Sequence, residues 1–74
     1  MSLFGQFLKV SREAAAMSQA SLAVAAGMSQ GKVSKLERGR IKPGWSDLAA
    51  FEAALGMSPE TAARMMVLAE RTAA

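Results

Sequence analysis

Residues 18–39, SQASLAVAAGMSQGKVSKLERG, predict two short helices joined by a tight turn. Ser18 and Ser29 each precede a helical segment, and a serine hydroxyl is a preferred acceptor for the first backbone amides of a helix. Gly27 follows the first segment, where a left-handed C-cap or a tight turn needs glycine. Because only Gly27 and Met28 separate the two predicted helices, we interpret residues 18–38 as a helix-turn-helix unit.

Three further helices are predicted around this unit, so the fold class expected is all-α with five helices. Apolar residues recur at helical spacing in the first segment, and Ser2 is placed to cap it. Pro59 follows Ser58 in the order typical of a helix start. The five predicted helices are 2–16, 18–26, 29–38, 47–55 with Ser46 as its cap, and 59–71.

The composition agrees with this fold class. Of 74 residues, 16 are alanine and 13 are leucine or methionine, whereas only 5 are valine or isoleucine, which favours helix over sheet. The length suits a single domain over residues 1–74. A core this small is marginal alone, so a homodimer is expected.

The side chains most often used in catalysis and metal binding are absent. The sequence has no cysteine, histidine or tyrosine, which excludes disulfides, thiolate metal sites and histidine bases. We therefore expect no enzyme activity, no metal and no cofactor. The carboxylates that acid–base chemistry would have to use are scattered: Glu13, Glu37, Asp47, Glu52, Glu60 and Glu70.

Positive charge is concentrated in residues 1–42, where seven basic and two acidic side chains give +5, whereas residues 43–74 carry −2. This asymmetry suggests a polyanion partner, with an ordinary solvated surface as the alternative. Residues 14–31 carry no charge, but their serines, glutamines and glycines argue against a membrane span. No signal peptide is evident, so we expect a cytoplasmic protein with no membrane partner.

The second helix of the unit has the residue types of a DNA-reading helix. Glutamine can pair with adenine, and lysine can reach the acceptors of guanine in the major groove. The candidates for base contact are Gln30, Lys32, Ser34 and Lys35, each with solvated surface as the alternative. Hydroxyls and amides at helix starts, and nearby basic side chains, contact phosphates. The candidates for phosphate contact are Ser18, Ser29, Arg38, Arg40 and Lys42.

Residues 18–39 resemble the signature of the Cro/C1-type (XRE-like) helix-turn-helix proteins. The resemblance extends over roughly residues 3–58, and it includes the ending Glu-Arg-Gly at 37–39 and the loop Lys-Pro-Gly-Trp at 42–45. It implies a five-helix, lambda repressor-like domain that binds double-stranded DNA operators as a dimer.

The resemblance also implies roles for particular residues. Gln19 is expected to contact a phosphate and to support Gln30, which is expected to contact a base. Arg12 and Glu37 are expected to form an ion pair between the first and third helices. At Gly31 relatives often carry a base-reading side chain, so either the backbone approaches DNA closely there or less is read.

For two features, the sequence is compatible with either a packing role or a binding role. Trp45 is expected to act as a hydrophobic staple on the fourth helix, with contact to the DNA backbone as the alternative. Met65, Met66 and Leu68 form either the core stripe of the fifth helix or a dimer interface, and small size and the resemblance favour the interface.

Together these observations predict a sequence-specific transcriptional regulator. The expected form is a homodimeric repressor or autoregulator that binds an inverted-repeat operator through the helix 29–38 in the major groove. The alternatives are an antitoxin that binds a toxin and represses its own operon, and a protein-interaction module on the same fold.

Overall fold

Five α-helices make up most of the chain. A computed structural model describes residues 2–72. The side chains that it does not describe, all in the last helix, are those of Pro59, Ala62, Met66, Ala69 and residues 70–72. The helices are α1 (Leu3–Ala14), α2 (Gln19–Ala26), α3 (Gln30–Glu37), α4 (Trp45–Leu55) and α5 (Pro59–Thr72). Residues 2–72 contain no strand, which confirms the all-α prediction, and none of their helices has the length and apolar character to cross a membrane.

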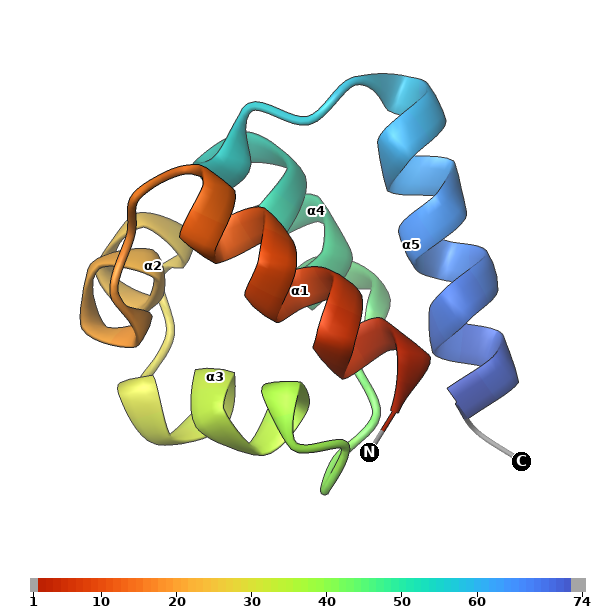
Figure 1. Cartoon of the computed structure of the whole chain (residues 1–74), viewed down its shortest axis with the longest axis horizontal. Coiled ribbons are helices and arrows are strands. Elements are labelled where there is room, and N and C mark those ends of the chain that lie inside the picture. Colours follow the sequence, from red (N-terminus) through yellow and green to blue (C-terminus); the bar gives the residue numbers. More distant parts are fainter. Residues whose placement is uncertain (1, 73–74) are drawn as a thin grey trace.

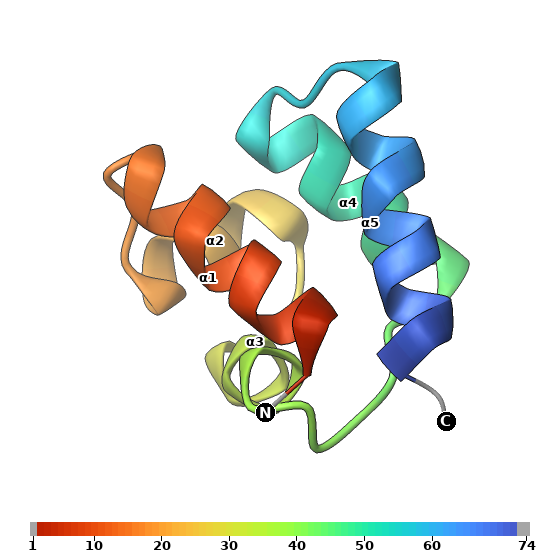
Figure 2. The ribbon, with the colours of Figure 1, turned by 45° about the vertical axis from the view of Figure 1, so that its right-hand side comes forward.

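The helices are arranged around α1 (Figure 1). α1 packs against α3 and α5, while α2 packs against α3 and α4. In the turned view α5 lies in front of α4, against which it also packs (Figure 2). The pair α2–α3 therefore forms one side of the molecule and α5 the other, which leaves the helix-turn-helix unit uncovered by the last helix.

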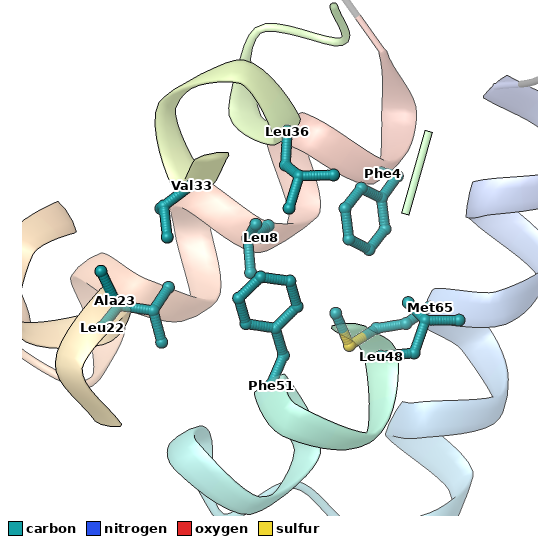
Figure 3. Packing of buried hydrophobic residues seen from close by; sticks show 9 residues of the cluster. All are labelled: Phe4, Leu8, Leu22, Ala23, Val33, Leu36, Leu48, Phe51 and Met65. Carbon is teal, nitrogen blue, oxygen red and sulfur yellow. The ribbon is translucent and has the colours of Figure 1, made fainter. Parts of the chain in front are cut away.

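All five helices contribute side chains to the core, and Phe51 of α4 lies in its middle (Figure 3). The Phe51 ring is tilted by 43° to that of Phe4, with 6.4 Å between the ring centroids. Val33 and Leu36 are fully buried in this core, so they fix one face of α3 to the rest of the chain. The buried apolar residues are Phe4, Leu8, Leu22, Ala23, Val33, Leu36, Leu48, Phe51 and Met65.

Serine residues cap the first three helices, as predicted. The caps are bonded as follows: Gly5 N donates to Ser2 Oγ at 2.8 Å, Ser21 N to Ser18 Oγ at 3.0 Å, and Lys32 N to Ser29 Oγ at 3.1 Å. Gly27 ends α2 in the left-handed conformation, with φ +68°, which is the role that the sequence predicted for it. The turn of the helix-turn-helix unit is thus defined by local chemistry at both of its ends.

The contact between α1 and α3 depends on Gly5. A Cβ atom at this position would overlap the carbonyl oxygen of Glu37, the last residue of α3. Glycine therefore allows the backbones of the two helices to approach more closely than any other residue would.

The start of α4 differs from the prediction. Ser46 was expected to cap the helix, but the helix begins at Trp45 and Gly44 is its N-cap. The reason is that Asp47, at the third helical position, accepts a hydrogen bond from Gly44 N at 2.9 Å. A carboxylate at that position satisfies the amide of the residue before the helix.

This shift also makes the predicted role of Trp45 wrong. A hydrophobic staple packs from outside the helix onto its first turns. Trp45 is instead the first helical residue, and 70% of its surface is exposed. Its indole ring therefore contributes little to the core.

The first helix is shorter than predicted. It ends at Ala14 rather than Ala16, and Ala16 adopts a left-handed conformation with φ +56°. This turn brings the carbonyl of Met17 to Arg12, whose Nη1 donates to it at 2.8 Å. Met17 N also donates to the carbonyl of Arg12 at 3.1 Å, and this backbone bond across the left-handed residue closes the end of α1.

The three residues of α5 that were expected at a dimer interface do not share one environment. Met65 is fully buried within the core, so it packs inside the chain and cannot meet a partner. Leu68 is half-buried against the core. The side chain of Met66 lies outside the described part of the chain.

Candidate nucleic-acid interface

The two faces of α3 have opposite characters. Val33 and Leu36 are fully buried, whereas Gln30, Gly31 and Lys35 are exposed. Ser34 lies between the two faces and is half-buried. Of the residues expected to contact bases, these exposed positions share one accessible surface of the helix.

α3 is held in place by α2 through the turn between them. Gly27 N and Met28 N donate to the carbonyls of Val24 and Ala23 at 3.2 and 2.9 Å. These bonds close the end of α2 before Ser29 caps α3. The end of α2 and the start of α3 are thus both defined by local hydrogen bonds, and the two helices pack against each other.

A buried ion pair fixes the other end of α3. Arg12 Nε donates to Glu37 Oε2 at 2.7 Å and Arg12 Nη2 to Oε1 at 3.2 Å, as expected for this pair from the resemblance. The hydrogen bond to Glu37 raises the pKa of Arg12 above its ordinary value, despite the opposing effect of burial. Since both side chains are buried, loss of either one would leave the other charge unpaired in the interior.

Gln19 belongs to this same network. Its Nε2 donates to Glu37 Oε1 at 3.1 Å, and its side chain is half-buried. Gln19 therefore ties the start of α2 to the end of α3, a role that the spacing in the sequence did not reveal. The contact with a phosphate that the resemblance implied stays a prediction, because the bond to Glu37 uses only one of the two N–H donors of this amide.

Lys32 occupies a different place from the other exposed residues of α3. Its Nζ lies 2.8 Å from Asp47 Oδ1, so the ammonium pairs with the first turn of α4. Burial alone would raise the pKa of Asp47, but the hydrogen bonds from Lys32 and Gly44 and the charge of Lys32 outweigh it, and the pKa of Asp47 lies below its ordinary value. In the DNA-free chain this pairing directs the charge of Lys32 toward α4, and contact between Lys32 and a base stays a prediction.

The match with known families agrees with this geometry. A family model described as a helix-turn-helix domain matches residues 3–65, which includes the whole of the α2–α3 unit. The chain belongs to this helix-turn-helix family. No curated protein and no solved structure matches the chain significantly.

In this helix-turn-helix domain the exposed positive charge extends past the end of α3. Arg38, Arg40 and Lys42 are all exposed, and they follow one another along the chain between α3 and α4. Such a row of cations attracts a polyanion over several ångströms, with a strength that falls as salt increases.

Sequence reasoning missed one basic residue beside this region. Lys9 of α1 lines a polar hollow, together with Arg12, Gln19, Glu37 and Arg38. Lys9 is three residues before Arg12 on the same helix, and this spacing alone could have placed both on one side of α1. The helix-turn-helix domain thus carries cations on α1 as well as on α3.

Outside this basic region, the surface has an apolar groove. Phe7, Ala63, Arg64, Val67 and Leu68 line a groove between α1 and α5. Among the described side chains, no three carboxylates come close enough together to hold a metal ion.

Proposed function

We propose that this helix-turn-helix domain binds double-stranded DNA in a sequence-specific manner, with α3 in the major groove. The observation that carries the proposal is the division of α3 into a buried face and an exposed polar face. A helix of this kind can enter the groove without giving up its packing against the domain.

Gln30 and Lys35 are the proposed base-reading residues. Both are exposed on the outer face of α3, and both side chains can bond to base edges in the major groove. Gly31 lies beside Gln30 and has open space around it, so the backbone of α3 can approach the bases closely there. Ser34 lies at the margin of this surface and is proposed as a secondary contact.

Phosphate contacts are proposed on both sides of this helix. Ser18 and Ser29 stand at the starts of α2 and α3, where backbone amides can also meet phosphates. Arg38, Arg40 and Lys42 extend the contact beyond the end of α3. Because such contacts release counterions, affinity is expected to fall steeply as salt rises.

The active form is proposed to be a homodimeric repressor or autoregulator. Two copies would present their α3 helices about 34 Å apart, which matches an inverted repeat read in successive major grooves. Since Met65 is buried, the surface proposed for dimerisation is the groove between α1 and α5, where Val67 and Phe7 offer apolar contact.

The function is tested by selecting the duplexes that the protein binds from a pool of randomised sequences. The role of α3 is then tested by measuring how tightly variants of α3 bind the enriched sequence. The Gln30→Ala and Lys35→Ala variants are each expected to weaken specific binding by about tenfold, since one good base contact contributes about 1–3 kcal/mol of discrimination. Gln6→Ala is the control, because Gln6 is an exposed glutamine on α1 that belongs neither to α3 nor to the lining of the groove between α1 and α5.

Enrichment of an inverted repeat, with loss of affinity only in the α3 variants, would support the proposal. Equal affinity of both α3 variants and the control, with the fold intact, would remove α3 from the interface. Absence of DNA binding by the folded protein would favour a role in protein interaction instead.

A further inference from the structure

Trp45 is far more exposed than is usual for a tryptophan. Tryptophan is on average one of the most buried residues, yet 70% of the surface of Trp45 is exposed. It is also the only tryptophan in the chain. An exposed indole of this kind contributes little to folding, and it offers a large apolar surface for a partner.

The position of Trp45 places it beside the proposed reading helix. Trp45 is the first residue of α4, and Asp47 in the same helical turn forms the ion pair with Lys32 in the first turn of α3. This pair ties the start of α4 to the start of α3. The indole therefore lies at the margin of the helix-turn-helix unit, and its helix is held there by a fixed contact.

The charge around Trp45 favours a polyanion. The preceding loop carries the exposed cations Arg40 and Lys42, and the carboxylate of Asp47 is already paired with Lys32. A second copy of the chain would bring the same cations against each other, which like-charge repulsion opposes. Ile41 lies between these two cations in the sequence, and 37% of its surface is exposed, so it adds apolar surface to the loop.

We propose that Trp45 packs against the deoxyribose–phosphate backbone of DNA, at the edge of the groove that α3 enters. The indole face covers the apolar side of a deoxyribose, and its Nε1–H donates to a phosphate oxygen. Arg40 and Lys42 neutralise the neighbouring phosphates. This inference rests on the proposed DNA-binding function, and it adds an uncharged contact to an interface that is otherwise held by charge.

Tryptophan emission measures this contact directly, because no other tryptophan and no tyrosine contributes. Trp45 in the free protein should be quenched readily by acrylamide, a neutral probe. Addition of a duplex of about 20 base pairs of random sequence at low salt, where sequence-independent binding is strong, should reduce that quenching several-fold. Binding of the same duplex is followed separately through the anisotropy of a dye on the DNA.

The variants separate apolar contact from charge. Trp45→Ala should weaken binding about tenfold, the scale of a tryptophan anchor, while the dependence of log affinity on log salt stays unchanged. Lys42→Ala should reduce the slope of that dependence by about 0.9, the value for one phosphate contact. Val24→Ala is the matched control, because Val24 on α2 is 83% exposed and lies outside the loop that precedes α4.

The outcomes distinguish this inference from the proposed function. Protection of Trp45 by DNA, with weaker binding of Trp45→Ala at an unchanged salt slope, supports the contact. DNA binding with unprotected emission, or with the affinity of Trp45→Ala equal to that of Val24→Ala, overturns the contact and leaves the function standing. Absence of DNA binding in the anisotropy measurement overturns both.

Discussion

Gly5 and Gly31 both lie inside helices, but their surroundings are opposite. A Cβ at Gly5 would overlap the backbone of Glu37, whereas a Cβ at Gly31 would have only Ser29 Oγ nearby, at 4.0 Å. The sequence gives no sign of this difference, because both glycines interrupt helical segments in the same way. Only the packing of α1 on α3 assigns a role to the first of them.

This contrast predicts opposite effects of alanine. Gly5→Ala should lower the free energy of unfolding by about 2 kcal/mol, because overpacking between α1 and α3 exceeds the gain in helix propensity. Gly31→Ala should raise it by about 0.5–1 kcal/mol, because only the propensity changes. Urea denaturation followed by circular dichroism measures both, and equal shifts in the two variants would contradict the packing of α1 on α3.

At the scale of the helices, local chemistry was predictable and contacts between distant residues were not. The serine caps and the left-handed Gly27 follow from the residues next to each helix end. By contrast, Lys32 and Asp47 belong to different helices and meet only in the folded chain, and no periodicity relates them. The start of α4 is a local exception, because Asp47 accepts the hydrogen bond from Gly44 N and the helix therefore begins before Ser46.

The candidate site divides in the same way. The exposed face of α3 follows from helical spacing in the sequence, but the place of Gln19 in the network around Glu37 depends on the fold. The exposure of Trp45 also could not be predicted, because a large aromatic residue next to a helix start is usually packed onto it.

The contact between α3 and α4 should depend on pH. The pKa of Asp47 is lowered in the folded state, so its stabilising effect is present above its unfolded pKa, about 3.9, and is lost as pH falls through the lower folded value. Asp47→Asn should therefore be less stable than the native chain by about 1 kcal/mol at neutral pH. Thermal denaturation between about pH 2 and pH 7 should show the two curves converging in acid.

Lys32→Met is the matched comparison for this measurement. It removes the ammonium but keeps the hydrogen bond from Gly44 to Asp47. Lys32→Met should therefore lose less stability than Asp47→Asn does. A stability difference between the native chain and Asp47→Asn that stays constant over the whole pH range would rule out this account.

For the whole molecule, the exposed apolar groove and the row of cations after α3 lie on different elements. The groove is formed by α1 and α5, whereas the row of cations follows α3. Two copies joined through the groove would therefore keep both basic surfaces accessible. This separation allows self-association and DNA binding to be tested independently.

Charge placed in the groove should prevent self-association. Val67 is 48% exposed, so Val67→Lys should fold normally but oppose a second copy at this surface. Sedimentation should show a monomer for Val67→Lys, and its affinity for an inverted repeat should fall at least tenfold because one half-site is lost. Val24→Lys adds the same charge outside the groove, and a similar loss of association in that control would argue against the groove as the interface.

The open space around Gly31 has a consequence for how this domain can acquire new DNA preferences. A Cβ there meets only Ser29 Oγ, so the protein interior does not constrain position 31, whereas in the proposed complex the bound duplex would. Under the proposed function, substitutions at this one position would alter the preferred operator while the scaffold keeps its stability. Related domains that differ only there would then diverge into separate regulatory circuits, each with its own operator, without passing through an unfolded ancestor.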